Sequence, residues 1–110
     1  MENNKYVVNW TETAQNDLLR IIDYISEESI SKAKNIFDKI SIKTNDLEFF
    51  PQKGKVVSEL KYHNIYHFRE IPVSPWRIFY TIENMNVFIM AVIDGRRNVE
   101  DILLNRFLGN

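Results

Sequence analysis

The sequence predicts an α+β fold, in which an N-terminal strand and an α-helical hairpin pack on a small, mostly antiparallel twisted β-sheet, followed by a short C-terminal helix. Apolar residues recur at helical spacing over 14–25 and again over 33–47. Two later runs, 76–82 and 87–93, are rich in β-branched and aromatic residues and are separated by four mostly polar residues, which is a hairpin signal. A helical hairpin must bury its apolar face, and the strands that follow it supply the surface.

The bulk composition fits one small domain, and we expect residues 1–110 to form it. The net charge is -1, so overall charge does not predict nucleic-acid binding. The chain has no cysteine, which excludes disulfides and thiolate metal sites. Residues 1–5 are polar and no apolar run reaches the length of a membrane span, so we expect a cytoplasmic protein without membrane contact.

The N-terminal part begins with a short strand over residues 6–10 and continues into the first helix. Thr11 or Thr13 is expected to cap this helix. Asp17 and Arg20 are assigned to its polar side. Its apolar stripe consists of Ala14, Leu18, Ile21, Ile22 and Ile25.

The second helix is expected to start at Ser29 or Ser31 and to close at Pro51, because proline disfavours helix at the preceding residue. Residues 55–60 are expected to form a strand or an extended arm. The stripe of this helix consists of Ala33, Ile36, Phe37, Ile40, Thr44 and Leu47.

The C-terminal half reads as strands and a last helix. Residues 65–73 predict a strand, after which Pro72 and Pro75 are expected to break the ladder. The nearly uniform apolar run 87–93 predicts a strand covered on both faces. Helical spacing over 99–108 predicts the final helix, with Gly109 as its end.

Arginines gather in the predicted strands, where burial is costly without a partner. Arg77 lies inside one strand of the hairpin and Arg96 and Arg97 follow the other, so we expect these side chains to approach one another. Such a cluster needs an anion: Asp94 inside the chain, or a phosphodiester or acidic protein segment outside it. The simpler interpretation is that each arginine pairs with a nearby carboxylate. The candidate residues for contact with such an external partner are Arg69, Trp76, Arg77, Arg96 and Arg97.

No motif for metal or cofactor chemistry is present. His63 and His67 lack the carboxylate neighbours of a metal site, and no glycine-rich phosphate loop exists. We therefore expect no metal and no cofactor. Metal-free RNA cleavage would use the arginines to stabilise the charge at phosphorus, with Glu59, His63 or His67 as the base.

Segments throughout the chain resemble the RelE/ParE superfamily of type II toxins, also known as plasmid stabilisation toxins. The resemblance implies a compact α+β growth-inhibiting toxin held inactive by a cognate antitoxin. It also implies that the antitoxin wraps the toxin with a helix or an added strand and that DNA is contacted only indirectly, through the antitoxin. The segments that carry it are 8–18, 24–25, 50–57, 68–73, 76–80 and 92–98.

The superfamily divides by target. RelE-like members cleave mRNA on the ribosome, and Arg77 and Arg96 match functional arginines of that branch, with Glu59 or His67 as the possible base. No tyrosine or histidine follows Tyr80, however, where that branch often carries one. The long helical hairpin and the 94–97 ending are more similar to ParE-like members, which poison DNA gyrase and are not nucleases. A family fold that has lost toxicity is the third alternative.

Overall fold

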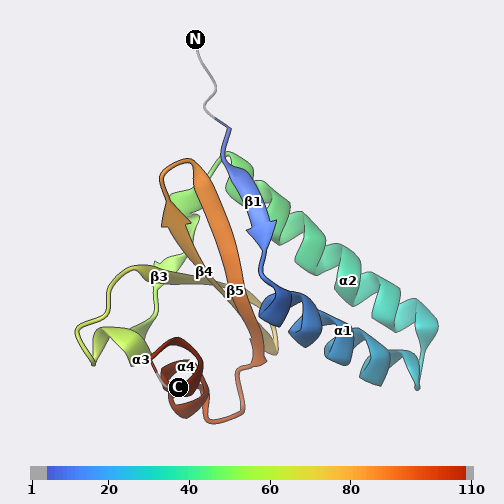
Figure 1. Ribbon diagram of the computed structural model, residues 1–110. Helices are drawn as coiled ribbons and strands as arrows, with labels where there is room; N and C mark the ends of the chain where they lie inside the picture. The colour runs from blue at the N-terminus through green and yellow to red at the C-terminus, as the bar shows by residue number, and fades with distance from the viewer. Residues whose placement is uncertain (1–4, 109–110) are drawn as a thin grey trace.

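The computed structural model describes residues 5–108. The chain forms a five-stranded sheet with helices on both faces (Figure 1). The elements in order are β1 (Val7–Trp10), α1 (Glu12–Ser26), α2 (Ile30–Asn45), the 3₁₀ turns η1 (Asp46–Glu48) and η2 (Pro51–Lys53), β2 (Lys55–Val56), α3 (Ser58–Lys61), β3 (Phe68–Val73), β4 (Trp76–Glu83), β5 (Asn86–Asp94) and α4 (Val99–Phe107). The predicted α+β class is confirmed, and helix α3 between β2 and β3 is an element that the sequence did not predict.

The sheet has the strand order β1-β5-β4-β3-β2 and is antiparallel except between β1 and β5. The predicted hairpin is β4–β5, in which Trp76 lies opposite Asp94 and Glu83 opposite Asn86. A bulge at Met90 shifts the register, because Phe79 pairs with Ala91 while Tyr80 pairs with Ile89.

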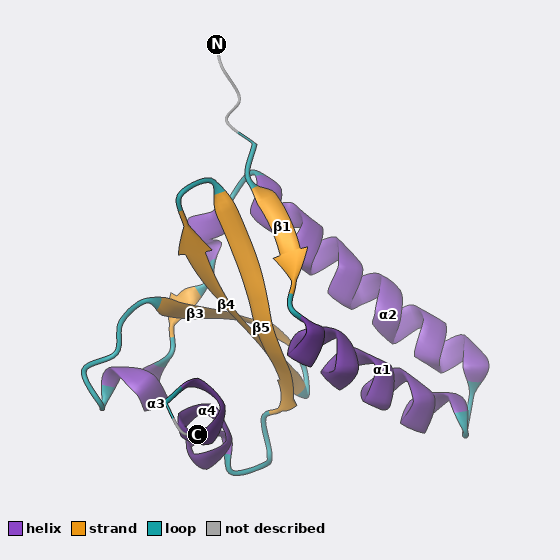
Figure 2. Ribbon diagram, viewed as in Figure 1, coloured by secondary structure: helices purple, strands orange, loops and turns teal. Residues whose placement is uncertain are grey.

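Helices α1 and α2 form the expected antiparallel hairpin and cover one face of the sheet (Figure 2). The Thr11 hydroxyl caps α1 by accepting from Ala14 N–H, and Ser29 caps α2 by accepting from Lys32 N–H. The hairpin stripe and the sheet share one core, which includes Leu18, Ile40, Leu47, Ile71, Ile78, Tyr80 and Ile89.

The opposite face of the sheet is covered by α3 and α4 (Figure 2). Side chains from β4 and β5 that alternate with the first core form a second one there. Its fully buried members include Val57, Leu60, Phe79, Ala91 and Leu103. The interior strand β5 therefore contributes to cores on both faces, as its continuous apolar run predicts.

Four expectations about local structure are wrong. Helix α2 ends at Asn45, before the 3₁₀ turn Asp46–Glu48, and does not continue to Pro51. Residues 55–60 form only a two-residue strand before helix α3 begins at Ser58. Pro72 does not break the ladder but pairs with Arg77 inside β3. The backbone nitrogen of Pro72 faces the sheet edge beyond the two-residue strand β2, so the missing N–H costs no hydrogen bond. Phe37, assigned to the buried stripe of α2, is 45% exposed.

Gly109, the predicted end of α4, lies outside the described residues. Within residues 5–108 no helix has the length and apolar content needed to span a membrane.

Candidate functional site

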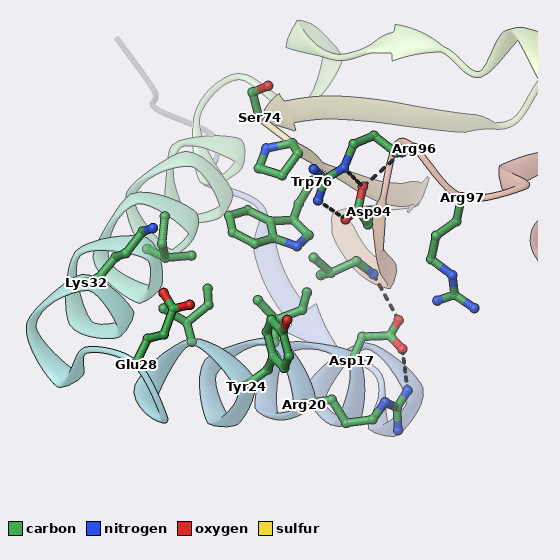
Figure 3. A pocket seen from close by; sticks show the side chains of 15 residues that line it. Asp17, Arg20, Tyr24, Glu28, Lys32, Ser74, Trp76, Asp94, Arg96 and Arg97 are labelled. Carbon is green, nitrogen blue, oxygen red and sulfur yellow. Dashed lines mark hydrogen bonds and ion pairs between the residues drawn. The ribbon is translucent and has the colours of Figure 1, made fainter.

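A groove of about 550 Å³ opens between the second half of α1, the start of α2 and the end of the β4–β5 hairpin (Figure 3). Its lining combines an apolar floor with charged groups. The apolar residues are Ile21, Tyr24, Ile25, Ile36, Trp76 and Val92, and the charged residues are Asp17, Arg20, Glu28, Lys32, Asp94, Arg96 and Arg97. Trp76 packs on the core with part of its side chain and borders the groove with the rest.

Asp17 of α1 lines the groove, and its side chain is only 3% exposed. Its carboxylate accepts the Val92 N–H at 3.0 Å and two bonds from the Arg106 guanidinium at 2.7 and 3.0 Å. Arg20 adds a fourth bond at 2.8 Å. Asp17 therefore connects α1, β5 and α4 through one buried carboxylate.

The Asp17 carboxylate fills a gap in the hydrogen bonding of the sheet. Strand β1 ends at Trp10, opposite Ile89, so the next part of β5 has no neighbouring strand on that side. The Val92 N–H points to this gap, and an unpaired buried N–H costs about 1–3 kcal/mol. Asp17 supplies the acceptor that a longer β1 would have given.

The assignment of Asp17 to the polar side of α1 is wrong. Position 17 lies three residues after Ala14 and four before Ile21, so helical spacing places it on the buried face. That spacing was the signal for a buried, partnered acid. Arg106 in α4 carried no comparable signal, because its contact with Asp17 spans 89 residues.

Arg96 and Asp94 form a local ion pair at the rim of the groove. The Asp94 carboxylate accepts the Arg96 backbone N–H at 2.9 Å and two bonds from its guanidinium. These bonds lower the pKa of Asp94 to about 2. Asp94 is thus the internal partner that the sequence suggested for Arg96. The Arg97 side chain makes no ion pair within residues 5–108.

Arg77 is held by two carboxylates on the opposite face of the sheet from the groove. Glu59 of α3 accepts from both terminal guanidinium nitrogens at 2.8 Å, and Glu70 of β3 accepts from Nε and Nη2 at 2.7 Å. The guanidinium also lies 5.1 Å from the centre of the Phe79 ring. All five N–H donors of a guanidinium lie in one plane, and the two bidentate pairs use four of them.

The predicted cluster of Arg77 with Arg96 and Arg97 does not form. The backbones approach as expected, since Arg77 pairs with Ile93 and its side chain packs beside Gly95. However, Trp76 and Arg77 are consecutive in β4 and point to opposite faces. Trp76 lies with Arg96 and Arg97 in the groove, whereas the Arg77 guanidinium turns to Glu59 and Glu70.

The ion pairs of Arg77 with Glu59 and Glu70 shift pKa values on this face of the sheet. Hydrogen bonds from Arg77 hold the pKa of Glu59 below its usual range, and the two carboxylates raise the pKa of Arg77. A carboxylate stabilised as an anion in this way is a weak base. His67 lies just before β3 with its ring against Phe68, and His63 bonds to Glu100 of α4 at 2.7 Å.

The lowered pKa of Glu59 predicts a pH dependence of stability. The charged Glu59 stabilises the fold above its unfolded pKa of about 4.5, and this contribution is lost as pH falls through the lower folded pKa. Replacing Glu59 by glutamine should therefore reduce stability at pH 7 by about 1–2 kcal/mol. Urea unfolding should show this difference shrinking in acid. A difference that stays constant down to pH 3, or that Glu27→Gln reproduces, would contradict the assignment.

Arg69 is used inside the fold. Its guanidinium donates to the Gly54 carbonyl at 2.6 Å and to the Gln52 carbonyl at 3.4 Å. The buried Tyr80 hydroxyl donates to the Pro51 carbonyl and accepts the Gly54 N–H, and burial raises its pKa. A Cβ on residue 54 would lie 2.5 Å from that hydroxyl, so the turn needs glycine there.

Comparison with known proteins agrees with this architecture. Residues 8–99 match the family described as the ParE toxin of the type II toxin-antitoxin system parDE. The chain is 27% identical over 90 residues to toxin ParE3 of Caulobacter vibrioides, covering 81% of this chain and 86% of that protein.

Two solved structures share the fold. A chain of the chromosomal ParDE system from P. aeruginosa superposes with a TM-score of 0.67 at 19% identity, covering 83% of this chain and 97% of that one. A chain of the RelBE2 toxin–antitoxin complex from Mycobacterium tuberculosis gives 0.55 at 21% identity, covering 84% and 94%.

Proposed function

Because the chain belongs to the ParE toxin family of type II toxin–antitoxin systems, we propose that it arrests growth by binding an essential protein, with DNA gyrase as the expected target. A cognate antitoxin neutralises it. The chain thus acts by protein contact, without chemistry of its own.

The ion pairs that Arg77 makes inside the fold are the observation on which this proposal rests. Metal-free RNA cleavage depends on a guanidinium that is free to bind the charged phosphorus. In this fold Arg77 is bonded to Glu59 and Glu70, and two carboxylates beside it repel a phosphodiester. Glu59, a candidate base, is the partner of the arginine that it would have to assist. The geometry therefore weighs against the RelE-like alternative.

The groove is the surface that best fits the antitoxin. Its floor is apolar, and two of its three carboxylates, Asp17 and Asp94, are already bonded to arginines. Among the other charged lining residues, Lys32 and Arg97 outnumber Glu28, and Arg20 shares the Asp17 carboxylate with Arg106. An amphipathic helix with one apolar face and acidic side chains beside it matches this surface in shape and charge.

Reversing one rim charge should weaken the antitoxin complex. Arg97→Glu places a negative charge where an acidic antitoxin segment is expected, so the Kd measured by calorimetry should rise at least about tenfold. The Arg97 side chain makes no ion pair within residues 5–108, so the melting temperature should stay unchanged. Lys39→Glu on the exposed side of α2 is the control. Equal Kd values for wild type and Arg97→Glu would exclude Arg97 from the interface.

The target is tested with purified gyrase. Supercoiling of relaxed plasmid should stop on addition of the toxin and recover when the antitoxin encoded beside it is added in excess. Undiminished supercoiling at saturating toxin would remove gyrase as the target. Toxin that also leaves growth unaffected in cells would indicate a family member without toxicity.

A further inference from the structure

A second surface rich in exposed apolar side chains lies at the end of α2 and the turns that follow. Ile42, Phe49 and Phe50 are 69%, 51% and 61% exposed. Lys43, Lys53 and Lys55 line the same region, which contains three adjoining hollows of about 470, 560 and 630 Å³. We call these six residues the Phe–Lys surface. Its hollows share no lining residue with the groove.

The backbone beneath this surface is held in place. The turn from Pro51 to Gly54 is fixed by the Tyr80 hydroxyl, and the Arg69 guanidinium bonds its carbonyls. Lys53 also bonds to Asp46 at 2.9 Å. A partner would therefore meet phenylalanine rings on an ordered backbone, which lowers the entropy lost on binding.

The chemistry of this surface indicates the kind of partner. Exposed aromatic rings are typical of the centre of protein interfaces, with charged groups around them. Asp46 is bonded to Lys53 and Glu70 to Arg77, so Glu48 is the one carboxylate lining these hollows that is left to oppose Lys43 and Lys55. The surplus is positive, in a chain whose net charge is -1. A phosphate backbone cannot bury the exposed Ile42, Phe49 and Phe50 side chains, so a protein that offers an apolar pocket beside acidic groups fits this surface better than nucleic acid does.

We propose that the Phe–Lys surface binds the growth-arrest target, at a protein site that offers an apolar pocket to the phenylalanines and carboxylates to the lysines. The inference rests on the proposed function and assigns the target to a surface separate from the antitoxin groove. Toxicity and antitoxin binding then depend on different residues.

The experiment separates these two activities. The double variant Phe49→Ser with Phe50→Ser should restore colony formation after toxin induction by about 100-fold, while the Kd for the antitoxin stays within about twofold of wild type. A second variant, Lys43→Glu with Lys55→Glu, changes exposed charges only and should do the same. Tyr62→Ser, which removes an 86% exposed aromatic elsewhere, should leave growth arrest intact.

Each result has one meaning. Growth arrest by the wild type and by both double variants would overturn the surface assignment alone. Double variants that lose antitoxin binding together with toxicity would show one shared surface and also overturn it. Weaker binding to a short DNA duplex, in step with the lost toxicity, would replace the protein partner with nucleic acid. A wild type that does not arrest growth would contradict the proposed function itself.

Discussion

Replacing Asp17 by asparagine is expected to lower the free energy of unfolding by about 3–5 kcal/mol, because it leaves a largely buried charge without its partner. The Arg106 side chain is 24% exposed and has Asp17 as its carboxylate partner in the structure. An asparagine also cannot accept all four bonds that the carboxylate accepts, and the Val92 N–H competes for its single oxygen. Helix α4 should loosen first.

Urea unfolding at neutral pH measures this loss, and the slope of the transition tests whether the variant still unfolds in two states. Asp23→Asn is the matched control, since it makes the same chemical change at an exposed position of α1. We expect it to change stability by less than about 0.5 kcal/mol. Two variants of equal stability would show that the Asp17 contacts contribute little.

Replacing Arg77 by methionine is expected to cost about 3–5 kcal/mol, because Glu59 and Glu70 then face each other without a cation. The Glu70 side chain is only 5% exposed. Arg77→Lys should also destabilise, since one ammonium cannot reproduce two bidentate pairs. Thermal unfolding of both variants measures the effect.

A triple variant tests whether the lost stability comes from the two unpaired carboxylates. When Glu59 and Glu70 are also changed to methionine, the buried charges disappear together and much of the lost stability should return. If Arg77→Met instead keeps full stability but abolishes toxicity, the residue acts on the target and its structural role is disproved.

Local pattern predicts much of this fold. The two apolar stripes at helical spacing predict α1 and α2, and the polar residues Thr11 and Ser29 just before these helices cap them. The apolar runs of the hairpin predict β4 and β5. These features depend on neighbours a few residues apart. Helix α3 was missed because its four residues are too few to show a period.

The candidate site was less predictable because its contacts join distant residues. The sequence indicates that arginines in strands need anionic partners, and that expectation holds for Arg77 and Arg96. It does not say which carboxylate serves which arginine, since Glu59 reaches Arg77 across 18 residues and Asp17 reaches Arg106 across 89. Side-chain alternation along β4 puts Arg77 on the same face as Phe79 and separates it from Trp76.

We propose that this toxin acts by protein contact, with Arg77 in a structural role. The most direct test induces the toxin in cells and, from one culture, maps cellular mRNA ends by primer extension and plasmid topology by gel. We expect intact mRNA with altered supercoiling or broken DNA. Codon-phased mRNA cuts with unchanged topology would contradict the account and make Arg77 and Arg96 residues of a nuclease.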